Sequence, residues 1–146
     1  MAKITKSDYK FFEMARKEAE KSDFGTFKLG AVLVFKKHVI GRGHNSNKTS
    51  PMQKKYNRYR QFNDSANGIH HSVHAEIAAL NSVPYPVAET VNWSDVKIYI
   101  YRISKGKDLG MGLSAPCPAC RAALRDLGIQ HLYYSGDNSF IYERMF

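Results

Sequence analysis

The chain has 146 residues, of which 43% are hydrophobic and 24% charged, a composition typical of one globular domain. It contains no apolar run long enough for a membrane-spanning helix, and residues 1–21 lack the apolar core of a secretory signal, so we expect a cytoplasmic location. The formal net charge of +9 favours a polyanionic or phosphorylated partner.

The first third of the chain predicts a helix followed by a hairpin. Apolar residues at helical spacing indicate a helix over 8–21, with Ser7 or Asp8 as its N-cap. Residues 30–35 are apolar and rich in β-branched side chains, and a short polar turn separates them from a second extended stretch, 39–45. These two stretches predict a β-hairpin whose turn type stays open.

Residues 44–73 are polar, basic and aromatic without a clear period, which predicts a long loop with one helical turn near 51–62. The later elements are a helix over 74–82, a strand over 96–104, a helix over 117–128 that ends at Gly128, and a strand over 129–136. The tail after them fits a short helix or an extended segment. The final strand–helix–strand order predicts a parallel crossover, and therefore a three-layer α/β/α domain over 1–146 with a central mixed sheet of about five strands.

Two short motifs carry the chemistry. His74 and Glu76 lie in a His-Ala-Glu stretch, and the chain's two cysteines, Cys117 and Cys120, lie in Pro-Cys-Pro-Ala-Cys. Because no secretory signal accompanies the cysteines, we expect a reduced thiol pair rather than a disulfide. One imidazole and two thiolates are good zinc ligands, and catalytic zinc sites leave the fourth tetrahedral position to water. The motifs therefore predict one catalytic Zn²⁺ bound by His74, Cys117 and Cys120.

Glu76 follows His74 by two residues, about 200° around a regular helix, but the geometry of a first turn is looser. We expect Glu76 to stand beside a zinc-activated water, take its proton and pass that proton to a leaving amine. Two simpler interpretations exist. A redox pair leaves His74 and Glu76 without a role, whereas a structural zinc site would need a fourth ligand, which His70 or His71 could supply.

Taken in order, the His-Ala-Glu and Pro-Cys-Pro-Ala-Cys motifs resemble the signature of the zinc-dependent cytidine/deoxycytidylate deaminase superfamily. The resemblance spans most of the chain and implies the α/β/α fold of that superfamily and hydrolytic deamination of an amino-pyrimidine or amino-purine. It implies that His74, Cys117 and Cys120 bind zinc and that Glu76 carries the proton. It also suggests a homo-oligomer.

Four further residues are predicted to contact substrate: Asn45, the backbone N–H of Ala75, Ser114 and Pro116. The resemblance implies the first two, although an Asn beside a turn often serves only the backbone. A second metal near His70 and His71 is not expected, because the superfamily members that bind a second zinc in this region use further cysteines, which this chain lacks.

Two basic stretches flank these motifs. We expect seven residues of these stretches to contact phosphate or a nucleic-acid strand: Lys48, Lys54, Lys55, Arg58, Tyr59, Arg102 and Lys105. Cations neutralise phosphates and aromatic rings stack on bases. The alternative is an ordinary solvated loop whose tyrosines pack on the core.

Three functions remain open. We place first the conversion of cytosine to uracil at the level of a (deoxy)cytidylate nucleotide. The second is deamination of cytosine or adenosine in single-stranded DNA, RNA or tRNA, which the net charge favours. The third is a non-catalytic, zinc-containing nucleic-acid-binding module, against which Glu76 argues, because a structural site has no use for a carboxylate there.

Overall fold

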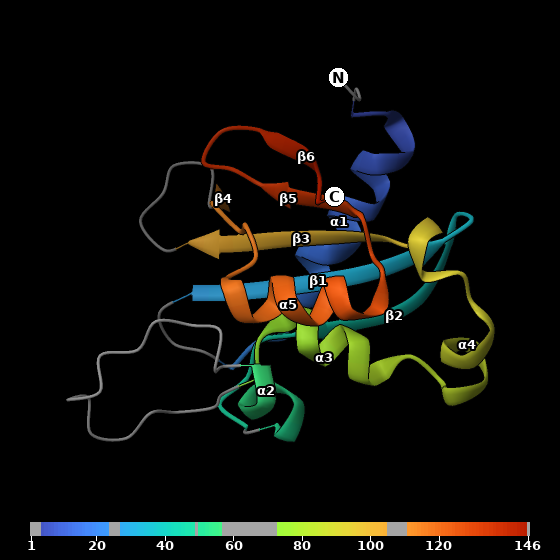
Figure 1. Ribbon diagram of the computed structural model, residues 1–146. Coiled ribbons are helices and arrows are strands. Elements are labelled where there is room, and N and C mark those ends of the chain that lie inside the picture. Colours follow the sequence, from blue (N-terminus) through green and yellow to red (C-terminus); the bar gives the residue numbers. More distant parts are fainter. Residues whose placement is uncertain (1–3, 24–26, 49, 57–72, 105–110, 146) are drawn as a thin grey trace.

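The computed structural model describes residues 4–23, 27–48, 50–56, 73–104 and 111–145, which form a mixed β-sheet with helices on both faces (Figure 1). The strands are β1 (Phe27–Phe35), β2 (His38–His44), β3 (Lys97–Ser104), β4 (Met111–Gly112), β5 (His131–Ser135) and β6 (Phe140–Arg144). The helices are α1 (Lys6–Ala19), α2 (Pro51–Tyr56), α3 (Ala75–Ser82), α4 (Tyr85–Thr90), α5 (Pro118–Leu127) and the short 3₁₀ turn η2 (Trp93–Asp95).

The strand order is β2-β1-β3-β5-β6, and the short β4 pairs with β3 outside this path. β3 and β5 run parallel and are joined through α5, whereas β1 is antiparallel to β2 and β3, and β6 is antiparallel to β5. The predicted α/β architecture with its central mixed sheet is confirmed, as is the parallel crossover between the strands predicted over 96–104 and 129–136.

Successive side chains of the central strands alternate between two cores, as the period of a strand requires. In β3, Ile98 and Ile100 face α3 and α5, whereas Tyr99 and Tyr101 face α1. We call these the α5 face and the α1 face of the sheet. Figure 1 shows α1 behind the sheet and α3 and α5 in front of it.

Helix α1 begins two residues earlier than its apolar periodicity suggests. Its N-cap is Thr5, whose hydroxyl accepts a hydrogen bond from the Asp8 backbone N–H, while the Asp8 carboxylate accepts one from the Thr5 N–H. This reciprocal capping box satisfies two donors at the helix start. The prediction of Ser7 or Asp8 as the N-cap was therefore wrong, because Asp8 caps from the third helical position.

Helix α3 packs so closely on β2 that no side chain fits between them. A Cβ added at Gly43 would lie 2.4 Å from the Ala79 backbone nitrogen. Glycine in the strand and alanines in the helix let the two backbones approach. This contact sets the position of the start of α3, where His74 lies.

The hairpin predicted over 30–45 is confirmed, and its turn consists of two lysines in an uncommon conformation. Lys36 and Lys37 have φ values of 49° and 67°. Two successive left-handed residues are typical of a type I′ turn, which fits the twist of a hairpin and usually contains Asn or Gly. A lysine in this region costs about 1 kcal/mol or more of backbone strain.

Two other segments form elements that the sequence pattern did not determine. The tail forms β6, and the proline-punctuated connection after α3 contains α4, in which Pro86 occupies an early position that needs no N–H donor. Of the predicted loop 44–73, residues 51–56 form α2, while residues 57–72 lie outside the part that the structure describes. Among the described residues, no helix is long and apolar enough to cross a membrane.

Candidate zinc site

His74 lies at the junction of α2 and α3. It is the N-cap of α3 with an extended backbone (φ −83°, ψ 159°), and its N–H donates to the Gln53 side-chain oxygen at 3.0 Å. Gln53 is completely buried in α2. Because His74 precedes the first helical residue, the angular spacing of a regular helix does not separate it from Glu76.

The two cysteines lie at the first turn of α5. Cys117 is the N-cap, Pro118 is the first helical residue, and Cys120 follows in the first turn. The helix ends at Gly128, which has a left-handed conformation (φ 98°). Both cysteines are free thiols, and the start of a helix favours their thiolate forms.

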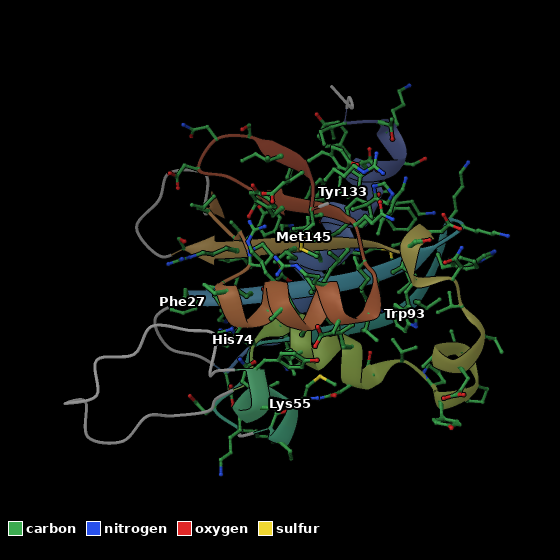
Figure 2. All side chains as sticks on the ribbon, in the orientation of Figure 1. Phe27, Lys55, His74, Trp93, Tyr133 and Met145 are labelled. Atoms are coloured by element: carbon green, nitrogen blue, oxygen red, sulfur yellow. The ribbon has the colours of Figure 1, made fainter. Side chains whose placement is uncertain are left out.

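Folding brings the three predicted ligands together at the spacing that zinc requires (Figure 2 labels His74 beside the start of α5). The His74 Nδ1 lies 3.6 Å from the Cys117 Sγ and 3.4 Å from the Cys120 Sγ. Zinc–sulfur bonds of about 2.3 Å and zinc–nitrogen bonds of about 2.0–2.1 Å place tetrahedral N and S ligands about 3.5–3.6 Å apart. A zinc ion therefore fits this cluster, which is reached from the surface at the partly exposed His74 and Cys117.

Glu76 is buried beside the cluster, with 4% of its surface exposed. Burial raises the pKa of Glu76, the nearby His74 acts in the opposite direction, and the Cys120 thiol donates a hydrogen bond to its carboxylate. The carboxylate therefore lies next to a sulfur ligand, where it can exchange protons with a molecule bound at the cluster.

The two thiols differ in acidity without a metal. The hydrogen bond with Cys120, followed by that with His74, lowers the pKa of Cys117 to about 3, although burial opposes this shift. The hydrogen bond with Cys117 and the burial of the side chain raise the pKa of Cys120. A zinc ion would have to displace the Cys120 proton, as thiolate ligands require.

An ion pair between α5 and β6 braces the loop before Cys117. The Arg121 guanidinium donates to the Pro116 carbonyl at 3.1 Å and to both Glu143 carboxylate oxygens at 2.6 and 3.1 Å. The Tyr134 hydroxyl also donates to Glu143 at 2.9 Å. The sequence analysis missed this brace because it did not assign the tail to a strand. The Pro116 that it predicted as a substrate contact is buried here, with its carbonyl paired to Arg121.

Two of the other predicted substrate contacts bind backbone groups. The Asn45 side chain accepts from the Leu29 N–H at 2.9 Å and donates to the Phe27 carbonyl at 3.3 Å, so it ties the end of β2 to β1. Ser114 is buried, donates to the Ile100 carbonyl at 3.0 Å and accepts from the Ser135 N–H at 2.8 Å. Both side chains therefore bind the backbone of the sheet.

Ala75 is fully buried as the first residue of α3, directly between His74 and Glu76. The predicted contact of its backbone N–H with substrate stays a prediction.

The predicted basic residues divide into described and undescribed groups. Lys48 lies next to the site, because its carbonyl accepts from the Val73 N–H at 2.9 Å, and Lys54 and Lys55 are exposed on α2. The Arg102 guanidinium lies 4.6 Å from the centre of the Phe27 ring. The predicted residues outside the described part of the chain are Arg58, Tyr59, His70, His71 and Lys105.

Known proteins share both the sequence pattern and the fold. Residues 5–136 match the family model of the cytidine and deoxycytidylate deaminase zinc-binding region. A search of curated proteins finds no match. The fold is similar to cytidine deaminase from Burkholderia pseudomallei (TM-score 0.60, 21% identity, covering 94% of this chain and 91% of that one). It is also similar to dCMP deaminase from the cyanophage S-TIM5 (TM-score 0.51, 18% identity, covering 86% and 79%).

The family match spans His74, the buried Glu76 and both cysteines, and the two solved structures are similar in fold. The predicted resemblance is thereby confirmed: this chain is a deaminase-family protein and belongs to the family of the cytidine and deoxycytidylate deaminase zinc-binding region.

Proposed function

We propose that the protein is a zinc-dependent hydrolase that converts a cytosine base to uracil, acting on a (deoxy)cytidylate nucleotide. The observation that carries the proposal is the His74–Cys117–Cys120 cluster at tetrahedral spacing with the buried Glu76 carboxylate beside it. Three protein ligands leave one position of a tetrahedral ion for solvent.

In this proposal His74, Cys117 and Cys120 hold the ion, and zinc supplies a water whose pKa falls from 15.7 towards about 7. Glu76 takes a proton from the attacking water and delivers it to the amine. The water oxygen forms a bond to the ring carbon, its second proton passes to the adjacent ring nitrogen, the carbon–nitrogen bond breaks, and ammonia leaves. The backbone N–H of Ala75, at the start of α3, orients the base.

The buried carboxylate favours an enzyme over a structural zinc module. Burying an acidic group without a cation partner is costly. A purely structural site gains nothing from this cost. In an enzyme the cost is offset by function, because the carboxylate lies beside the cluster, where it can move a proton between the water and the amine.

The choice of a nucleotide rests on local charge and on the related structures. Lys48 binds the backbone of Val73, the residue before His74, and Arg102 lies on β3 near Leu29 and Asn45, so each could neutralise one phosphate. The cyanophage enzyme with this fold has been crystallised in complex with dCMP and dUMP. We propose that Asn45, Ser114 and Pro116 shape the pocket through the backbone, and that Lys54 and Lys55 lie at its rim.

A base within single-stranded nucleic acid is the second candidate, because a net charge of +9 exceeds what one phosphate needs. The decisive experiment measures ammonia release from cytidine, dCMP, a cytosine-containing single-stranded oligonucleotide and an adenosine-containing tRNA stem-loop, at low and high salt. We expect dCMP to give the highest kcat/KM, with little salt dependence.

Glu76→Gln protein, prepared in the same way, controls for a contaminating deaminase. Turnover of the oligonucleotide or stem-loop alone, with a steep loss of rate as salt rises, would show that the nucleotide assignment is wrong. No turnover of any of the four substrates by zinc-loaded protein would overturn the enzymatic assignment itself.

Two further properties belong to this proposal. The two free thiols need a reducing compartment, which makes the cytoplasm the proposed location. Assembly into a homo-oligomer also stays a prediction, which the mass of the native protein in solution tests.

A further inference from the structure

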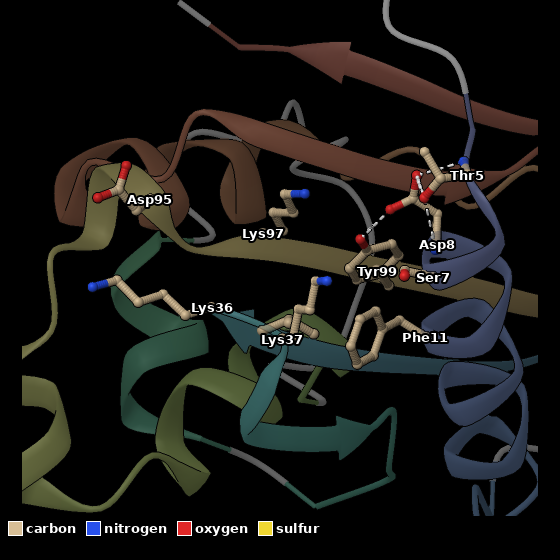
Figure 3. Close-up of a pocket in the computed structure, with 10 residues that line it drawn as sticks. Thr5, Ser7, Asp8, Phe11, Lys36, Lys37, Asp95, Lys97 and Tyr99 are labelled. Atoms are coloured by element: carbon tan, nitrogen blue, oxygen red, sulfur yellow. Dashed lines mark hydrogen bonds between the residues drawn. The ribbon is translucent and has the colours of Figure 1, made fainter.

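A cavity of about 510 Å³ lies on the α1 face, at the end of the sheet far from the zinc site (Figure 3). It lies where α1 begins, where the turn after β1 projects, and where β3 starts. The zinc site, in contrast, lies near the first residues of β1, because the Ser46 N–H donates to the carbonyl of Val73, which precedes His74, and the neighbouring Asn45 binds the backbone of Leu29. The volume lies within the range of small-molecule sites.

Three lysines line this cavity: Lys36, Lys37 and Lys97. Within the described part of the chain, none of them lies within ion-pair distance of a carboxylate. Figure 3 shows the Lys37 and Lys97 ammonium groups directed towards the same part of the cavity, while Lys36 extends towards the side of Asp95. The lysines therefore place unneutralised positive charge around a hollow.

The two acidic residues of the cavity have hydrogen-bond donors of their own. The Asp8 carboxylate accepts from the Tyr99 hydroxyl at 2.5 Å and from the Thr5 N–H at 2.8 Å. The Asp95 carboxylate accepts from the Asn92 amide at 3.0 Å. These bonds stabilise both carboxylates without the lysines, so the three ammonium groups remain available to a bound anion.

The backbone at Lys36 and Lys37 supports a role for their side chains. Both residues have positive φ values, in a turn where Asn and Gly would be less strained. Strained residues persist where the surrounding structure holds them and often where the side chain has a function. In this turn the strained backbone directs the Lys37 ammonium group towards the cavity, while the Lys36 ammonium group lies at its edge, 5.3 Å from the centre of the Phe35 ring.

We propose that this cavity is a second ligand site, separate from the zinc site, and that it binds a small phosphate-bearing molecule. Lys37 and Lys97 contact the phosphate as point charges, and Lys36 adds positive charge at the edge of the cavity. The Ser7 hydroxyl at the cavity wall donates to it. The apolar part of the ligand lies against the side of the cavity formed by Phe11 and Val34.

The test follows backbone amide resonances while inorganic phosphate replaces chloride at constant ionic strength. We expect saturable shifts at residues 34–37 and 95–99. Lys36→Gln/Lys37→Gln should weaken the phosphate affinity by about tenfold or more, because each hydrogen bond to a charged group carries about that factor. Lys17→Gln/Arg125→Gln removes the same charge from exposed residues of α1 and α5, and its affinity should stay within about twofold of the unmodified protein.

A second variant separates binding from folding. Lys36→Asn/Lys37→Gly suits the type I′ turn, so we expect its Tm to rise by a few degrees while the phosphate-induced shifts at 34–37 and 95–99 disappear. The proposal is wrong if phosphate leaves these amides unchanged, if this folded variant still binds phosphate, or if both double Gln variants lose affinity equally.

Discussion

The two faces of the sheet are packed by different kinds of side chain. On the α1 face, one long helix covers an aromatic layer in which Tyr99 and Tyr133 stack at 4.5 Å and Phe12 stacks on Phe140 at 4.0 Å. On the α5 face, α3 and α5 cover aliphatic side chains and contribute many alanines, among them Ala75, Ala79 and Ala123. Large rings fill most of the space under α1, which approaches the sheet closely at Gly30, whereas small side chains let several backbones approach on the α5 face.

This difference explains where the site lies. His74 and Cys117 are the N-caps of α3 and α5, so the positions of these two helices set the distances between the ligands. Close packing leaves α3 and α5 little room to shift without moving the ligand residues at their starts. We therefore expect changes on the α5 face to alter both stability and metal binding, and changes on the α1 face to alter stability alone.

The largest expected effect is on activity, at the centre of the α5 face. Glu76→Gln removes the proton carrier but keeps the shape of the side chain, so kcat should fall by about 10²–10⁴-fold. Zinc content and Tm should change little, because Glu76 is not a ligand. Steady-state kinetics together with metal content checks this, and a variant that retains full activity would contradict the role of Glu76.

A comparable free-energy change is expected on the α1 face, but in stability. Phe12 is 1% exposed and contacts Tyr99, Tyr133 and Phe140. Phe12→Ala should lower the free energy of unfolding by about 3–5 kcal/mol, since it leaves a cavity in the aromatic layer. The activity per folded molecule, measured at low temperature, should match that of the unmodified protein. A large loss there would show that the two faces are coupled.

A pair of glycine substitutions compares the faces directly. A Cβ at Gly43 would lie 2.4 Å from the Ala79 nitrogen of α3, and a Cβ at Gly30 would lie 2.2 Å from the Ala15 oxygen of α1. Each Gly→Ala change should cost roughly 1–3 kcal/mol of stability through overpacking. We expect only Gly43→Ala to weaken zinc affinity as well, by about tenfold, as competition with a chelator can measure. Equal zinc affinities in the two variants would refute the comparison.

The smallest expected effect concerns pH. The Arg121 guanidinium lowers the pKa of Glu143 below its usual value, although partial burial opposes this. The ion pair therefore stabilises the fold at neutral pH, and this contribution is lost as the pH falls through the lowered pKa, below about 4.5.

Glu143→Gln should thus lose less than about 1 kcal/mol at neutral pH, because the pair is partly exposed, and should differ less from the unmodified protein at about pH 3. Chemical denaturation at both pH values measures this. A difference that grows as the pH falls would have the wrong sign.

The sequence predicted the elements with strong periodicity, and it predicted as zinc ligands three residues that the fold brings together. The helix near 8–21, the hairpin and the strand at 96–104 follow from local patterns, and the metal cluster follows from residue chemistry at a distinctive spacing. The helix, the hairpin and the strand were predicted correctly because burial of one face leaves a periodic pattern of apolar residues in the sequence.

The remaining features depend on tertiary contacts. The tail has no period of its own and becomes β6 only by pairing with β5. The Arg121–Glu143 ion pair depends on the position of β6, so no local sequence pattern predicts it. Asn45 was predicted as a substrate contact from the family resemblance, and Ser114 was predicted as one too. Only the fold reveals that both side chains bind the backbones of neighbouring strands.

The most direct test of the account measures the metal and its ligands in the purified protein. After expression with zinc, metal content and X-ray absorption should give one zinc per chain with one nitrogen and two sulfurs from the protein, the sulfurs at about 2.3 Å, and one light-atom ligand from solvent. The His74→Ala and Cys120→Ser variants should lose the ion. Protein that binds no zinc, or binds it equally well without these side chains, would contradict the account.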